Sequence, residues 1–256
     1  CIPKEELTLE SSSRESCIEE VTHETTSPEP GSGLESEQNV THETIGDVTH
    51  VTKYHIIEVT PYRIEAKYSD FRHPDDIKFS DNIEDDLKRR DFTINALAYN
   101  PYKGQIIDLY KGQEDIKDKV IRAVGNPNDR FQEDALRMLR AIRFSTQLNF
   151  ALSYDTMQAI VDNAHLLKNI SFERIRDEFV KIIMSDTPMI GIGLLSKLGL
   201  LKYIIPELEE GIGCEQKGEH IYDVWEHLLH ALDHAGNKGW PLEVRLAALF
   251  HDIGKP

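Results

Sequence analysis

One candidate for chemistry is the string RRDFTINA at residues 89–96. Its two adjacent arginines carry planar guanidinium groups with several donors, which suit the oxygens of phosphate and ribose groups. Asp91 can orient one of these arginines or accept a hydrogen bond from a sugar hydroxyl. The simpler alternative is a solvated helix start with Asp91 as its cap. The string thus predicts a phosphate- and ribose-binding site that includes Arg90 and Asp91.

A second candidate is the string RFQEDALRMLRAIRF at residues 130–144, which has the composition of a helix. Its polar residues recur every three positions: Asp134, Arg137, Arg140 and Arg143. On one helix they would form a slowly winding polar stripe, while Leu136, Leu139 and Ile142 face inward. A carboxylate beside a guanidinium can pair with the edge of a base, and the other arginines can meet a triphosphate. The alternative is an exposed helix with ion pairs three residues apart.

A third candidate is a metal site near the end of the sequence. His227 lies in a predicted helix, and His251 and Asp252 follow another. Imidazole and carboxylate groups on two packed helices are suitable ligands for a divalent metal. His220, His230 and His234 are expected to be packing or surface residues instead.

The first two strings resemble motifs B and D of the class II tRNA nucleotidyltransferases (CCA-adding enzymes) and the bacterial poly(A) polymerases. The resemblance runs from about residue 46 to 256, with Glu173-Arg174-Ile175 similar to motif E. It implies template-independent addition of CCA, from CTP and ATP, to the 3′ end of tRNA. It also implies that motif B, with Arg90 and Asp91, lines the ribose and phosphates.

In motif D the resemblance implies that Asp134 and Arg137 select ATP and CTP, and that Arg140 and Arg143 contact nucleotide or RNA. The histidine site is similar to that of HD-domain phosphohydrolases, whose final aspartate ligand would lie beyond Pro256. Many bacterial CCA-adding enzymes carry such a domain in this place. A divalent metal in an incomplete HD site is therefore expected.

The resemblance has a gap at the catalytic metal site. The family's head carries an Asp-x-Asp pair that holds two Mg²⁺ ions, which clamp the attacking hydroxyl and the leaving pyrophosphate. No Asp-x-Asp precedes residue 89 in this sequence. Glu58 matches the family's third carboxylate, although Pro61 is unusual beside it. One carboxylate cannot replace the pair, so the chain is expected to be an inactive fragment that binds nucleotide weakly.

These features require an α+β fold. We expect the remnant of a nucleotidyltransferase β head, then a mainly α-helical neck and body, then the start of an HD-type helical domain. The predicted divisions are residues 1–45 without structure, 46–110 for the partial head, 111–205 for the RNA-binding neck and 206–256 for the truncated HD domain. Strands are predicted within 48–66 and helices at 172–184, 189–204, 221–236 and 242–253. The apolar face predicted for the helix at 172–184 consists of Phe172, Ile175, Phe179, Ile182 and Ile183.

Charge and composition narrow the class of protein only partly. The net charge of −16 disfavours a nucleic-acid partner at first sight. Residues 1–45, however, hold eleven Glu against one Lys and one Arg, which leaves −7 for the other 211 residues. No apolar run approaches the roughly 20 residues of a membrane span. Three scattered cysteines and no visible signal peptide predict a reduced, cytoplasmic protein, and we expect the chain to be an internal piece of a longer one.

Three other functions remain open from the sequence. A bacterial poly(A) polymerase shares both motifs. A metal-dependent phosphohydrolase would use the HD site and keep the rest as a vestige. A tRNA-binding remnant would bind tRNA in a salt-dependent way without adding nucleotides.

Overall fold

The computed structural model describes residues 40–45, 48–53, 59–65, 77–216 and 221–256. The chain forms two compact units, residues 1–58 and 59–256, which we describe separately. In the first unit β1 (Val40–Ile45) and β2 (Val48–Lys53) form an antiparallel hairpin. The first of these strands lies in the segment expected to lack structure. Both strands begin with the fragment Val-Thr-His, whose β-branched residues favour strands.

The described strands of the second unit form three short two-stranded sheets. β3 (Arg63–Glu65) pairs with β4 (Ile77–Phe79), and β5 (Leu97–Asn100) pairs with β6 (Gln105–Asp108), both antiparallel. The third pair is parallel and joins β7 (Val120–Ile121) to β8 (Ala151–Leu152). The two helices Pro127–Glu133 and Leu136–Leu148 lie between these strands in the sequence. Short strands therefore occur among the helices up to residue 152.

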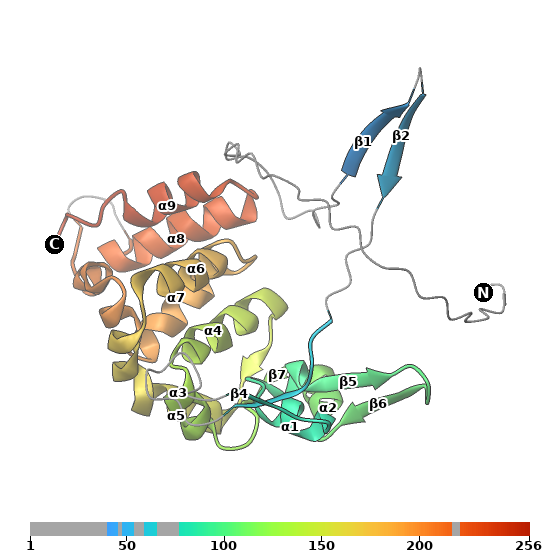
Figure 1. Ribbon diagram of the computed structural model, residues 1–256. Coiled ribbons are helices and arrows are strands. Elements are labelled where there is room, and N and C mark those ends of the chain that lie inside the picture. Colours follow the sequence, from blue (N-terminus) through green and yellow to red (C-terminus); the bar gives the residue numbers. More distant parts are fainter. Residues whose placement is uncertain (1–39, 46–47, 54–58, 66–76, 217–220) are drawn as a thin grey trace. The chain divides into compact units, whose positions relative to one another are not determined.

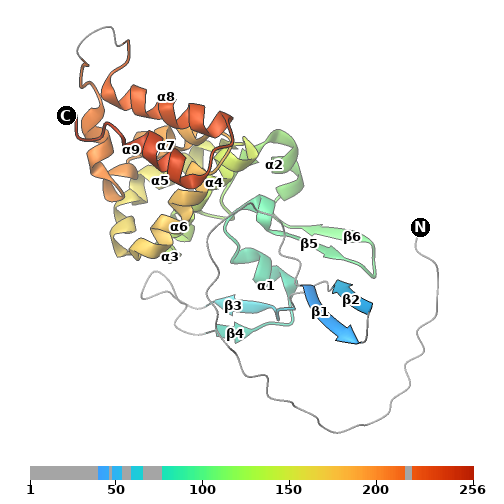
Figure 2. The same cartoon turned by 90° about the horizontal axis from the view of Figure 1, so that it is seen from above.

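Helices make up most of the second unit. In chain order they are α1 (Ile83–Lys88), α2 (Gly112–Asp118), α3 (Pro127–Glu133), α4 (Leu136–Leu148), α5 (Tyr154–Asn163), α6 (Phe172–Ile183), α7 (Pro188–Lys197), α8 (Val224–Asn237) and α9 (Leu242–Phe250). Figures 1 and 2 show α4 packed against α6 and α7, and α8 beside α9. The α+β class predicted from the sequence is confirmed. None of the described helices is long and apolar enough to cross a membrane.

Two predicted helices differ from the structure in ways that affect the sites. The helix expected over 130–144 is broken after Glu133, because Asp134 is extended (φ −145°) and its carboxylate accepts the N–H of Leu136 at 3.0 Å. Such a contact competes with a continuous helix. The helix expected over 189–204 ends at Lys197, and Gly199 adopts φ 71° two residues later. A left-handed glycine is a common helix terminator.

The core runs along the inner faces of the helices. In α4, Leu139 and Ile142 are fully buried and Leu136 nearly so, which confirms the predicted inward stripe. In α6, Ile175, Phe179, Ile182 and Ile183 are buried as predicted. Phe172 is 68% exposed, because at the first position of α6 it lies beyond the edge of the packed face.

Arg245 ties the last two helices to α6. Its buried guanidinium donates to the carbonyl oxygens of Ile183 (2.9 Å), Ser185 (2.8 Å) and Trp240 (2.9 Å). These carbonyls belong to helix ends or turns, which lack a partner within their own helices. The arginine thereby fixes α9 relative to the rest of the helical body.

Candidate functional site

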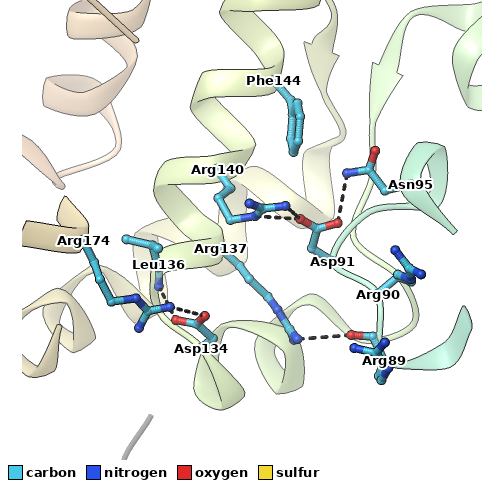
Figure 3. Close-up of a pocket in the computed structure, with 10 residues that line it drawn as sticks. All are labelled: Arg89, Arg90, Asp91, Asn95, Asp134, Leu136, Arg137, Arg140, Phe144 and Arg174. Carbon is cyan, nitrogen blue, oxygen red and sulfur yellow. Dashed lines mark hydrogen bonds and ion pairs between the residues drawn. The ribbon is translucent and has the colours of Figure 1, made fainter. Parts of the chain in front are cut away.

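One candidate site is a cavity of about 520 Å³, which we call the arginine pocket. Its volume falls within the usual range for small-molecule sites. Ten residues line it: Arg89, Arg90, Asp91, Asn95, Asp134, Leu136, Arg137, Arg140, Phe144 and Arg174. Figure 3 shows them converging from the loop after α1, from the α3–α4 junction, from α4 and from α6. Five guanidinium groups face two carboxylates, so the lining carries a net charge of +3.

The structure brings together five of the six residues predicted to bind nucleotide. Arg90 and Asp91 come from the first string, and Asp134, Arg137 and Arg140 come from the second. The pocket residues of the first string lie more than 40 positions before those of the second, since Asp91 and Asp134 are 43 positions apart. Their meeting in one pocket is a result of the fold.

Asp91 organises one wall of the pocket. One carboxylate oxygen accepts the N–H of Phe92 (2.8 Å) and the side-chain amide of Asn95 (3.0 Å). The other accepts two hydrogen bonds from Arg140, at 2.8 and 2.6 Å. The guanidinium of Arg140 lies 5.4 Å from the centre of the Phe144 ring. Asp91 therefore positions Arg140 rather than pointing a free carboxylate at a ligand.

Asp86, near the end of α1, positions the two arginines of the first string, Arg89 and Arg90. Its carboxylate accepts from Arg89 at 2.6 Å and from Arg90 at 3.0 Å. Burial alone would raise the pKa of Asp86, but the hydrogen bonds and charges of Arg89 and Arg90 outweigh it and hold the pKa below its ordinary value. The Arg90 side chain is still 46% exposed, so it can reach a ligand.

We expect Asp86→Asn to weaken nucleotide binding by about tenfold, since both arginines lose a charged acceptor. Titration calorimetry with CTP checks this, with Asp85→Asn as the control, because Asp85 accepts from Ser80 outside the pocket. The lowered pKa of Asp86 also predicts how folding stability depends on pH. The stabilisation from ionised Asp86 is present above the unfolded pKa of about 3.9 and is lost as the pH falls through the folded pKa. Equal affinity in the Asp86→Asn variant and the wild-type chain would contradict the positioning role.

Asp134 faces the pocket from the break between α3 and α4. One oxygen accepts the Leu136 N–H, and the other accepts from Arg174 of α6 at 2.8 Å. Arg174 was not among the predicted site residues, although its motif-E-like string was visible. Only the bend at Asp134 directs this carboxylate toward α6, and a continuous helix would not.

Arg137 joins the two halves of the pocket. It donates to the carbonyl oxygen of Arg89 at 3.1 Å and to the carboxylate of Glu133 at 2.6 Å. Arg130 shares Glu133 and donates to the carbonyl oxygen of Lys88 at 3.0 Å. Two arginines of α3 and α4 thus satisfy carbonyls at the end of α1, where a cation is favourable.

Arg143 is the predicted residue that the structure places elsewhere. It is buried between α4 and α6 and donates to Glu178 at 2.9 Å. The reason lies in helix geometry: each step of three residues lags a full turn by about 60°, so two steps carry Arg143 about 120° around from Arg137. The guanidinium carbon of Arg143 lies 4.3 Å from the centre of the ring of Phe144, which lines the pocket. Arg143 is therefore left out of the nucleotide-binding residues proposed below.

Glu58, the predicted third carboxylate, lies outside the described residues, as does His220. His230 and His234 are exposed, the first against Tyr222 and the second against Trp240.

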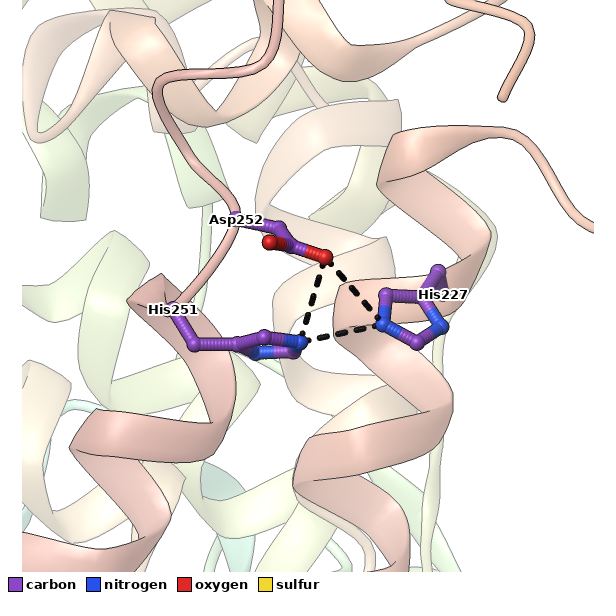
Figure 4. Close-up of side chains that lie close together, drawn as sticks. All are labelled: His227, His251 and Asp252. Carbon is purple, nitrogen blue, oxygen red and sulfur yellow. Dashed lines mark hydrogen bonds and ion pairs between the residues drawn. The ribbon is translucent and has the colours of Figure 1, made fainter. Parts of the chain in front are cut away.

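The predicted metal-binding residues form a compact cluster, shown in Figure 4. The Nε2 atoms of His227 and His251 lie 3.0 Å apart, and one oxygen of Asp252 lies 3.4 and 3.3 Å from them. Ligand bonds of about 2.1 Å separate neighbouring ligand atoms by roughly 3.0–3.4 Å, so three such atoms can share one ion. Nδ1 of His251 lies 2.9 Å from the carbonyl oxygen of Ala248, a contact that directs Nε2 toward the cluster.

Lys255 also reaches this cluster. It donates to Asp252 at 2.7 Å, and this hydrogen bond is the main cause that holds the pKa of Asp252 below its ordinary value. Nearby His251 and His227 act in the same direction. Asp252 is therefore an ionised carboxylate. A metal ion bound there would either share this carboxylate with Lys255 or displace Lys255 from it.

Two family profiles match separate segments of the chain. Residues 24–122 match the profile of the "Poly A polymerase head domain", and residues 149–212 match "Probable RNA and SrmB- binding site of polymerase A". The arginine pocket takes residues from the first segment, from the second and from the stretch between them. Over these two segments the chain is similar to the poly(A) polymerase family.

The relatives that it matches are CCA-adding enzymes. It is 49% identical over 164 residues to the CCA-adding enzyme of Ligilactobacillus salivarius, covering 64% of this chain and 40% of the relative. The Bacillus stearothermophilus CCA-adding enzyme in complex with CTP has a TM-score of 0.55 and 32% identity, over 86% of this chain and 55% of that one. The Thermotoga maritima CCA-adding enzyme complexed with tRNA has a TM-score of 0.52 and 27% identity, over 66% and 41%. The chain spans about two fifths of the curated relative.

Proposed function

We propose that this chain is the nucleotide-selecting part of an enzyme that adds CCA, from CTP and ATP, to the 3′ end of tRNA without a nucleic-acid template. The arginine pocket carries the proposal: five guanidinium groups surround two fixed carboxylates in a cavity of nucleotide size. A triphosphate is the ligand that best balances the excess positive charge. A cytoplasmic location belongs to the same proposal.

Six residues of the pocket, and Asp86 beside it, have separate roles in this proposal. Arg90 and Arg140 hold phosphate or ribose oxygens, and Asp86 and Asp91 keep them in place. Asp134 and Arg137 present an acceptor and a donor to the edge of the base, as a pairing partner would. Arg174 holds the carboxylate of Asp134 in the orientation that reads the base.

The transfer step needs divalent metal ions, Mg²⁺ in this proposal, and this chain's residues do not fit them. Two-metal transfer requires paired carboxylates, and the sequence has no Asp-x-Asp before motif B. Glu58 alone cannot supply the pair. The chain as it stands is therefore proposed to bind nucleotide and tRNA without forming the phosphodiester bond.

Competitive titration of this chain with the four nucleoside triphosphates tests the function. We expect CTP and ATP to bind about tenfold or more tightly than UTP and GTP, a difference that one good base-edge pair supplies. Arg140→Ala should weaken all four, whereas Arg176→Ala should change none, because Arg176 pairs with neighbouring Asp177 at the surface. Binding of ATP without CTP would instead favour the poly(A) polymerase alternative, and binding of none would reject the proposal.

We propose in addition that His227, His251 and Asp252 bind one divalent metal ion. The support is the separation of their three ligand atoms, 3.0 to 3.4 Å, from two helices that Arg245 helps to hold. An ion held by two imidazoles and one carboxylate would leave coordination positions open, which suits phosphate-ester hydrolysis. A hydrolytic HD-type site is therefore the second candidate function.

We expect His227→Ala to lower the affinity for Mn²⁺ or Zn²⁺ by about tenfold or more, since one of three ligands is removed. Calorimetric titration with each ion measures the effect. His234→Ala is the control, because His234 lies on the same helix against Trp240. Equal losses in both variants, or no ion bound by the wild-type chain, would count against the site.

A further inference from the structure

Two ionic contacts join α6 to the segment 134–143, which begins at Asp134 and continues into α4. Arg174 of α6 donates to the carboxylate of Asp134 at 2.8 Å. One turn later in α6, Glu178 accepts from Arg143 of α4 at 2.9 Å. Residues four positions apart lie on the same face of a helix. The two contacts therefore fix how far α6 lies along α4 and how it is turned.

The contact between Arg143 and Glu178 is poorly explained by stability. Both side chains are buried, and an ion pair often fails to recover the cost of taking its charges out of water. The Nε atom of Arg143 and the second oxygen of Glu178 are buried without a hydrogen-bond partner among the described residues. Apolar side chains of similar size would fill the same space without these costs. The charged pair thus needs another explanation.

Directionality is what an ion pair adds to a packed interface. α4 and α6 otherwise contribute buried apolar side chains to one core, among them Ile142 and Phe179. Apolar burial is non-directional, so it tolerates small displacements of one helix along the other. A hydrogen bond between guanidinium and carboxylate is restricted in distance and angle. Fixing the register of packed helices is the best-attested role of a buried polar group.

We propose that Glu178 is a positioning residue for base selection. By holding Arg143 it fixes the register of α6 against α4. Arg174 of α6 then keeps the Asp134 carboxylate in the orientation that reads the base. The proposal rests on the proposed function, in which Asp134 selects the nucleotide. Glu178 does not line the arginine pocket, so it acts only through these other residues.

A second route from this pair to the pocket leads through Phe144. The guanidinium of Arg143 lies 4.3 Å from the centre of the Phe144 ring, and that of Arg140 lies 5.4 Å from it. Both Phe144 and Arg140 line the pocket (Figure 3). An effect by this route would weaken every triphosphate alike, because Arg140 holds phosphate or ribose in the proposed function. An effect through Arg174 would change the preference among bases instead.

The test replaces the pair by apolar side chains of similar size, in the full chain with Arg143→Met and Glu178→Leu. Competition titrations measure the preference for CTP and ATP over UTP and GTP. We expect this preference to fall by about three- to tenfold, part of the roughly ten- to hundredfold that one base-edge pair supplies. The affinity for inorganic tripolyphosphate, which has no base, should be unchanged. The control variant Arg176→Met, Asp177→Leu removes an exposed ion pair of the same helix and should keep the preference.

Two further variants test the route. In the Arg174→Ala background, the double substitution at Arg143 and Glu178 should change the preference no further, because the residue through which it acts is gone. Arg143→Lys keeps a buried charge pair but replaces a planar fork by a point charge, which fixes orientation less well. It should also lower the preference, and it serves if the apolar variant does not fold in urea-unfolding controls.

Amide hydrogen exchange gives a measurement that needs no nucleotide. The Leu136 N–H donates to the Asp134 carboxylate at 3.0 Å, so its exchange reports whether that carboxylate stays in place. It should exchange faster in the apolar pair variant than in wild type. The Phe92 N–H, which donates to Asp91 at 2.8 Å, should exchange at an unchanged rate.

The outcomes separate this proposal from the function on which it rests. If the wild-type chain prefers CTP and ATP, an unchanged preference in the apolar pair variant overturns the positioning role and leaves the function standing. A uniform loss of affinity for all four nucleotides and tripolyphosphate overturns it as well. A wild-type chain without any preference, together with faster Leu136 exchange in the variant, would reject the function and keep the positioning role.

Discussion

Glu178→Ala should destabilise the second unit by about 3 to 5 kcal/mol, the usual cost of breaking a buried ion pair by removing one partner. The Arg143 and Glu178 side chains are only 10% and 5% exposed and meet at 2.9 Å between α4 and α6. Burial lowers the pKa of Arg143 from its ordinary value, and the charge of Glu178 opposes that effect. Without Glu178, the guanidinium remains buried with no carboxylate to offset its lost hydration.

The pair itself is not expected to be strongly stabilising. The Nε atom of Arg143 and the second oxygen of Glu178 are buried without a hydrogen-bond partner among the described residues. The double variant Arg143→Met, Glu178→Leu should therefore unfold within about 1 to 2 kcal/mol of wild type, or be more stable, because neither charge remains to be desolvated. Urea unfolding measures all three proteins. Asp177→Ala, one residue away in an exposed pair, should change stability by less than about 1 kcal/mol. A single variant as stable as wild type would contradict the argument.

Asp134→Ala should reduce the preference for CTP and ATP over UTP and GTP by about ten- to a hundredfold, the discrimination of one base-edge pair. The carboxylate is held by the Leu136 N–H and by Arg174, so it offers a fixed acceptor rather than a mobile one. Its removal takes away the acceptor but leaves Arg90 and Arg140 for the phosphates. We therefore expect selectivity to fall more than affinity.

Competition titrations of the variant with all four nucleotides measure this ratio. Arg174→Ala is the informative companion, because it frees Asp134 without removing its charge; it should lose part of the selectivity. Asp162→Ala, whose carboxylate accepts from Gln158 at the surface, is the control. A variant at Asp134 that keeps its full preference for CTP and ATP would reject the role of this residue in base selection.

The sequence predicted the pocket's members better than their arrangement. Residue type and spacing in the two arginine-rich strings left simpler alternatives open, and their resemblance to motifs B and D led to the prediction of nucleotide binding. The helix break at Asp134 was not predictable, since Ala135, Leu136 and Met138 all favour a continuous helix. At the break the Asp134 carboxylate also accepts from Arg174, 40 residues later, a contact that local sequence patterns do not reveal. Arg143 was grouped with its neighbours by a period of three, whereas a helix repeats at 3.6.

Long-range partners account for the other differences. Asp86 was not singled out, because a carboxylate near arginines is commonplace at a helix end and only its burial distinguishes it. The parallel pairing of Val120–Ile121 with Ala151–Leu152 involves strands of two residues, too short for any period to reveal. The cluster of His227, His251 and Asp252 was the simplest case, because one helix and the end of the next position all three side chains, and the two helices are neighbours in the sequence.

The internal pairing of the arginine pocket has a consequence for exchange of ligands. Asp91, Asp134 and most of the guanidinium groups already have partners in the protein. An arriving nucleotide therefore replaces existing hydrogen bonds instead of meeting bare charges, so the net free energy of each new bond is small. Under the proposed function, we expect such a site to bind its nucleotide weakly while still discriminating between bases. In the complete enzyme of the proposed function, which would accept two different nucleotides in turn, weak net binding of each would favour their exchange.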